Sequence, residues 1–68
     1  MIELKRFMRR HRLTQDQAGQ VLGYSRHFMS SIAQGRRETP EPMQALLLAI
    51  DMMGDQAPAF IDRRLSKA

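Results

Sequence analysis

A very short connection between two helix signals is the feature that most constrains this chain. Residues 14–17 form a capping box, in which the Thr14 hydroxyl can accept from the Gln17 amide and the Gln17 side chain can reach back to the Thr14 amide. The helix that starts there is expected to end at Gly23, because glycine adopts a positive φ after a helix at little cost. Ser25 follows at once as a good N-cap for a further helix. The spacing therefore predicts two short helices that pack as a tight, angled pair.

The rest of the chain also has helical periodicity, and no segment alternates convincingly in the manner of a strand. Pro40 and Pro42 disfavour helical angles in the residues before them, so a later helix is expected to start near Pro42. The predicted fold class is all-α, a compact five-helix domain. In chain order, the expected helices span about 4–11, 15–22, 26–34, 42–53 and 58–65.

Length and the absence of cysteine limit how such a domain is stabilised. The 68 residues allow a single domain, 1–68, and a chain this short buries only about 60% of its unfolded surface. Without cysteine there are no disulfides or usual zinc frameworks, and His11 and His27 have no nearby partners of ligand type. We therefore expect no metal and no cofactor, and oligomerisation remains as the way to add stability.

The sequence holds none of the usual catalytic or membrane signals. It has no Ser/His/Asp arrangement, no plausible carboxylate pair and no phosphate loop, so an enzyme is not expected. No stretch approaches the roughly 20 apolar residues that cross a bilayer. The N-terminus lacks the apolar core of a secretion signal, so a cytoplasmic protein is expected.

Positive charge gathers in the N-terminal half of the chain. The net charge is +4, but residues 1–37 carry eight Lys/Arg against two acids, whereas residues 38–68 carry three against five. A basic half joined to a slightly acidic half is typical of a protein that meets a polyanion on one face. A basic surface that is merely solvated is the alternative.

Residues 15–34 resemble the helix-turn-helix of the lambda-repressor-like, Xre/Cro-type transcriptional regulators. Gly19 stands at the small-residue position where the two helices approach most closely, and Gly23 stands at the turn. The positions that lock the two helices together hold Ala18, Leu22, Tyr24, Met29 and Ile32. The resemblance covers about residues 3–53. It implies a lambda-repressor-like domain with its helix-turn-helix core at 14–35, completed by residues 42–66.

Two positions depart from the pattern of that family. The family commonly has an arginine and a glutamate that pair across the fold, where this chain has Met8 and Ala33. Losing one partner alone would leave a partly buried charge, which is costly, whereas replacing both with apolar groups can be neutral. We therefore expect the same fold with an apolar contact in that place.

The resemblance implies that the helix at 26–34 enters the major groove of double-stranded DNA. Arg26 is the expected base reader, because its planar fork can donate twice to guanine. The candidate base-contacting residues are Arg26, His27, Ser30 and Ser31, although His27 could equally cover surface. The candidate phosphate-contacting residues, at the ends of the unit, are Gln15, Ser25, Gln34, Arg36 and Arg37. Phe28 is expected to pack rather than to touch a thymine methyl, and the arginines of the first helix face either DNA or solvent.

The fourth expected helix is apolar around most of its circumference. From Met43 to Met53 only Gln44 and Asp51 are polar, so one side can complete the core while the rest needs the fifth helix or a second subunit. We expect a homodimer, because a monomer of this size reads too few base pairs. Its two reading helices would lie about 34–36 Å apart on an inverted repeat. The candidate interface residues are Ala45, Leu48, Met52, Phe60, Ile61 and Leu65.

Together these features imply a small dimeric regulator, bacterial or phage, that binds a palindromic operator at the nucleoid. A repressor or autorepressor is expected, Cro-like or of the kind found in anti-CRISPR operons. No small-molecule ligand is expected, because 68 residues leave no room for a sensing domain. The alternatives are an antitoxin of a toxin–antitoxin pair and a protein–protein adaptor with the same fold.

Overall fold

The computed structural model describes residues 4–66, and over that range it contains helices joined by short connections and no strand. Its elements are α1 (Leu4–His11), α2 (Gln15–Leu22), α3 (Arg26–Ala33), α4 (Glu41–Met52), the short 3-10 helix η1 (Gly54–Gln56) and α5 (Ala57–Ser66). The prediction of an all-α, five-helix fold is confirmed. Residues 1–3 and 67–68 belong to the predicted single domain but lie outside the described residues.

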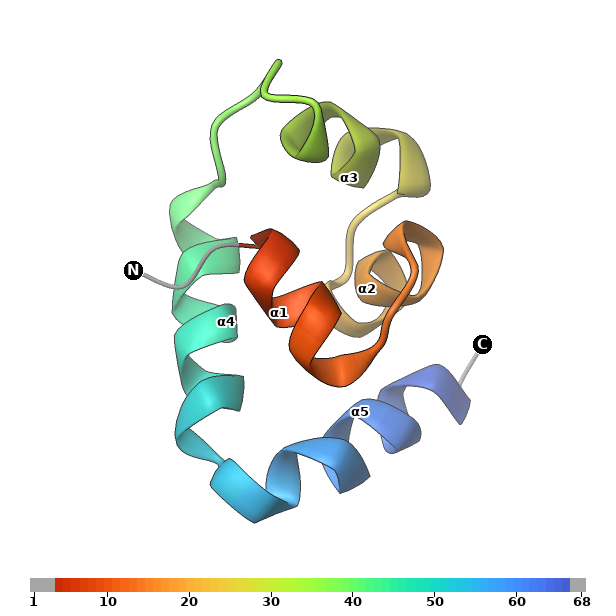
Figure 1. Cartoon of the computed structure of the whole chain (residues 1–68), viewed down its shortest axis with the longest axis vertical. Helices are drawn as coiled ribbons and strands as arrows, with labels where there is room; N and C mark the ends of the chain where they lie inside the picture. Colours follow the sequence, from red (N-terminus) through yellow and green to blue (C-terminus); the bar gives the residue numbers. More distant parts are fainter. Residues whose placement is uncertain (1–3, 67–68) are drawn as a thin grey trace.

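The helices surround α1, which lies in the middle of the molecule (Figure 1). In that view α3 occupies the upper end, α5 crosses the lower end, and α4 runs along one side between them. The molecule measures 32 × 26 × 19 Å along its principal axes. Because α3 and α5 lie at opposite ends, α5 leaves the outer side of α3 uncovered.

The core takes side chains from every α-helix and is wholly apolar. No polar or charged side chain is buried among residues 4–66. Fully burying an aliphatic side chain contributes roughly 1.5–3 kcal/mol relative to leaving it exposed, so these contacts supply the main stabilisation. The buried residues are Leu4, Phe7, Ala18, Val21, Leu22, Met29, Met43, Leu47, Ile50, Ala57 and Ile61.

The two predicted helix starts and the turn between them are confirmed in detail. The Gln17 amide donates to the Thr14 hydroxyl at 3.1 Å, and the Thr14 amide donates to the Gln17 side chain at 3.0 Å. Gly23 adopts a left-handed conformation with φ of 86°, as the end of α2 requires. The Ser25 hydroxyl accepts from the Phe28 amide at 3.1 Å and so caps α3.

The ends of the other helices differ slightly from the expectation. Arg12 ends α1 with φ of 56°, a conformation that usually favours glycine, and the Leu13 amide then donates to the Met8 carbonyl at 2.9 Å. α4 starts at Glu41, one residue before Pro42, because a proline within the first turn loses no helical hydrogen bond. Between α4 and α5 the chain makes the 3-10 turn η1, which the periodicity did not reveal.

Candidate nucleic-acid interface

The angle between α2 and α3 is set by a close backbone contact at Gly19. A Cβ atom at this position would lie 2.6 Å from the Tyr24 carbonyl oxygen and 3.2 Å from Cγ of Met29. The Gly19 carbonyl accepts from the amides of Gly23 at 2.7 Å and Tyr24 at 2.9 Å. Only glycine fits this contact, which confirms the expected close approach of the two helices and fixes the direction in which α3 projects.

The side chains of α3 divide into a buried, apolar inner side and an outer side whose polar groups are exposed or half-buried. Met29 is completely buried and Ile32 is half-buried against the core. Arg26 and His27 are exposed, and within the described chain their side chains form no hydrogen bond or ion pair. Their donor groups are therefore free to meet a ligand on the outer side of α3.

The two serines of α3 are half-buried and already make local hydrogen bonds. The Ser31 hydroxyl donates to the His27 carbonyl at 3.1 Å, and the Ser30 hydroxyl accepts from the Gln34 side-chain amide at 3.2 Å. Ser30 thus keeps its proton for donation, whereas Ser31 keeps only acceptor capacity. Both side chains are short, so they allow close approach and add little discrimination between bases.

Further donors lie at the N-terminal ends of α2 and α3. The capping box uses the Gln17 amide but leaves the amides of Gln15 and Asp16 for an external acceptor. The Ser25 hydroxyl accepts within the cap and still has a proton to donate. The Asp16 carboxylate stands in the same first turn, where it lies 3.4 Å from the Gln20 side-chain nitrogen. The donors at this end of α2 are therefore backbone amides that stand beside one acidic side chain.

A stack of three side chains lies against the first turn of α3. The rings of Tyr24 and Phe28 lie 5.0 Å apart at an interplanar angle of 16°, and the Arg37 guanidinium lies 5.0 Å from the centre of the Phe28 ring. Phe28 packs against the core as predicted. The spacing of four residues between Tyr24 and Phe28 was a signal for their contact, but the position of Arg37 above the ring had none. The stack holds Arg37 beside α3, and Arg36 is exposed next to it.

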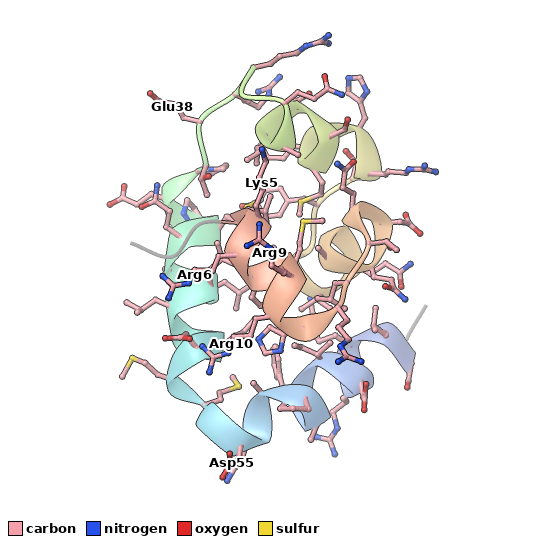
Figure 2. The ribbon with its side chains drawn as sticks, in the orientation of Figure 1. Lys5, Arg6, Arg9, Arg10, Glu38 and Asp55 are labelled. Carbon is pink, nitrogen blue, oxygen red and sulfur yellow. The ribbon has the colours of Figure 1, made fainter. Side chains whose placement is uncertain are left out.

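The positive charges near α3 are not neutralised within the described chain. The ion pair found among residues 4–66 joins Arg10 to Asp51 at 2.8 Å, between α1 and α4. Figure 2 shows Glu38 on the connector after α3, pointing away from the body of the molecule. Arg26, Arg36 and Arg37 therefore present an uncompensated positive surface at this end of the protein.

The outer side of α4 presents large apolar side chains to solvent. Leu48 is 52% exposed and Met52 is 78% exposed. Ala45 is exposed on the same helix, whereas Phe60 and Leu65 of α5 are half-buried. Ala45, Leu48 and Met52 are named the α4 stripe below.

Ile61 differs from the other candidate interface residues. It is only 4% exposed and belongs to the core, because α5 packs on α2 and turns this side chain inward. We therefore remove Ile61 from the candidate interface and assign it to the core of the single chain.

The described residues show no metal site or membrane span. No group of three or more His, Cys, Asp or Glu side chains comes together in residues 4–66. None of the helices in that range is long and apolar enough to cross a bilayer.

Comparison with known proteins identifies the family. Residues 2–56, a range that includes all of α1 to η1, match the family model described as a helix-turn-helix domain. The match takes in most of the chain, so the protein belongs to the helix-turn-helix domain family, in agreement with the resemblance to Xre/Cro-like regulators. This membership indicates DNA binding, and such domains are typically not enzymes. No curated protein and no solved structure matches the chain.

Proposed function

We propose that this protein is a small dimeric transcriptional regulator that reads an inverted repeat through the major groove of double-stranded DNA. The observation that supports this most directly is the outer side of α3. Its exposed Arg26 and His27 have free donors, while the contact at Gly19 holds the helix rigidly against α2. A fixed helix with free polar groups on its outer side suits direct readout of base edges.

In this proposal some residues contact the bases and others contact only the DNA backbone. Arg26 donates twice to one guanine, and His27 and Ser30 add single donors to neighbouring bases or phosphates. Ser31 contributes an acceptor and allows close approach. The groups that grip the backbone and fix the register, without reading sequence, are Gln15, Ser25, Gln34, Arg36 and Arg37.

The homodimer rests on the α4 stripe. Leu48 and Met52 are the two large apolar side chains that the described chain leaves most exposed. Such a patch on a small protein marks an interaction surface. A second copy of the chain can pack its α4 stripe against the α4 stripe of the first and so form a two-fold dimer. In this dimer both α3 helices face the same side. A dimer of this kind represses by occluding a promoter, in the manner of a Cro-like autorepressor, and its occupancy follows its own concentration.

Selection of bound sequences from random DNA tests the reading of bases. We expect a palindromic consensus with half-sites about 10 base pairs apart. Arg26→Ala should then weaken operator binding by about 1–3 kcal/mol and relax preference at one position of each half-site. Arg36→Ala should weaken binding to all sequences alike, and Arg63→Ala, an exposed arginine on α5, is the control for lost charge. If Arg26→Ala and Arg63→Ala behave alike, the groove assignment is wrong.

Sedimentation analysis tests the interface. Leu48→Glu should give monomers, because it places a charge in the middle of the α4 stripe, where an unpaired buried charge is costly. Gln20→Glu adds the same charge at an exposed position of α2 and should leave the dimer intact. A dimer that survives Leu48→Glu would place the interface elsewhere.

A further inference from the structure

A second positive surface lies on α1, apart from the helix-turn-helix. Lys5, Arg6 and Arg9 are all exposed, and we name them the basic face of α1. Figure 2 shows Lys5 toward the end of α1 that is nearer α3, whereas Arg10 lies toward α5. Arg10 is engaged by Asp51 at 2.8 Å and is not counted with the other three. Nothing in the proposed reading of bases by α3 uses these residues.

The stability of α1 does not explain why these residues are cationic. Within Leu4–His11 the first turn of α1 contains no acid, and Lys5 and Arg6 stand near the positive end of the helix dipole. Lys5 and Arg9 are four residues apart, a spacing at which like charges repel on a helix. A face that only contacts solvent does not need charges of one sign, because a mixture of acidic and basic residues is solvated equally well. Local choices that oppose stability are expected at functional sites.

The chemistry of the basic face favours phosphates over a protein partner. The apolar residues of α1 point inward, since Leu4 and Phe7 are buried and Met8 is packed against the core. A protein interface needs an apolar centre with few charges, and this face offers none. A phosphate backbone, in contrast, is bound through positive charge alone. Two of the three residues are arginines, whose planar fork matches phosphate oxygens.

We propose that the basic face of α1 binds backbone phosphates that flank the site read by α3, on the same duplex. The proposal rests on the proposed function, because α3 brings the protein to that duplex. The longest axis of the molecule is 32 Å, which is about one turn of DNA. Lys5 lies at the end of α1 that is nearer α3 (Figure 2), so we expect any phosphates that α1 contacts to lie within one turn of the half-site. These contacts extend the footprint and add affinity without sequence preference.

The salt dependence of DNA binding on duplexes of two lengths tests this proposal. One duplex contains the selected inverted repeat alone, and the other carries about one further helical turn of random sequence at each end. We expect Lys5→Gln, Arg6→Gln and Arg9→Gln each to reduce the slope of log K against log salt by about 1.8 on the long duplex, which is about 0.9 for each of the two subunits. The short duplex should show no such reduction. Arg63→Gln removes the same charge from the last turn of α5 and should leave both slopes unchanged.

Thermal unfolding of the same variants separates a binding role from a structural one. Removal of the repulsion between Lys5 and Arg9 should leave the melting temperature unchanged or raised while DNA affinity falls. A lowered melting temperature would show a structural role and overturn the proposal. The proposal would also be overturned if the α1 variants showed the same salt slope as Arg63→Gln on the long duplex. It would be overturned as well if they bound a single duplex as the wild type does and lost only the ability to join two separate duplexes.

The two proposals fail in distinguishable ways. If random selection yields no consensus, the reading of bases fails, but the α1 variants still lower the salt slope on a long random duplex. If a consensus appears and the α1 variants bind the long duplex as the wild type does, only the basic face of α1 fails.

Discussion

Replacement of Gly19 by alanine sets two physical effects against each other. Within a helix, alanine is favoured over glycine by about 1 kcal/mol, so helix propensity alone predicts stabilisation. The structure predicts the opposite, because the new Cβ would lie 2.6 Å from the Tyr24 carbonyl oxygen. That oxygen belongs to the backbone of the turn and cannot rotate away as a flexible side chain can.

The size of the effect follows from how the turn is held. Moving Tyr24 away from the methyl group strains the bonds that the Gly19 carbonyl accepts at 2.7 and 2.9 Å. Overpacking of this kind costs about 1–3 kcal/mol. After the gain in propensity is subtracted, we expect Gly19→Ala to lower the free energy of unfolding by up to about 2 kcal/mol. For a domain of this size each kcal/mol lowers the melting temperature by roughly 4–8 °C.

Thermal unfolding followed by circular dichroism measures this directly. Gln20→Ala, at the next and exposed position of α2, is the matched control and should change stability by less than about 0.5 kcal/mol. Operator affinity of Gly19→Ala should fall as well, measured at a temperature where the variant is folded, because α3 is displaced. A Gly19→Ala protein more stable than the wild type would refute the close contact between α2 and α3.

Two further predictions concern contacts outside the helix-turn-helix. Arg64 of α5 donates from Nε to the Val21 carbonyl at 3.1 Å. Arg64→Met should therefore lower the free energy of unfolding in denaturant by about 1 kcal/mol. Equal denaturant midpoints for the variant and the wild type would show that this hydrogen bond does not stabilise the fold. Burial, then the charge of Arg10, lowers the pKa of His11 below its ordinary value of 6.5. Stability is complete above pH 6.5 and falls below it, since the unfolded chain binds a proton that the folded chain resists. His11→Gln should flatten this loss, and an unchanged pH profile would contradict it.

The parts of the fold that were predictable from sequence are those that local chemistry specifies. The capping box at Thr14, the turn at Gly23 and the cap at Ser25 each depend on residues within four positions, and all three form as predicted. Arg12 shows the limit of this reasoning, because a non-glycine residue ends α1 in a left-handed conformation. No local pattern announces such an exception.

The features that sequence reasoning missed depend on contacts between distant segments. Arg10 meets Asp51 across 41 positions. In the same way, the guanidinium of Arg37 comes to lie over Phe28 only after the connector has folded back. Ile61 was expected on an interface, since periodicity marks an apolar position without telling which neighbour covers it. For the same reason, the sequence predicts that one side of α3 faces outward, but it does not show which hydrogen-bond donors on that side are already bonded within the chain.

The apolar core has a consequence for how this protein can change. Among residues 4–66 no polar side chain is buried, so the groups that maintain the fold and the groups on the outer side of α3 are separate sets. Exposed positions away from caps usually alter stability by less than about 0.5 kcal/mol when they are substituted. Arg26 and His27 can therefore be substituted one at a time, and each single variant should still fold. In the laboratory, a library restricted to these two positions should yield folded members almost throughout.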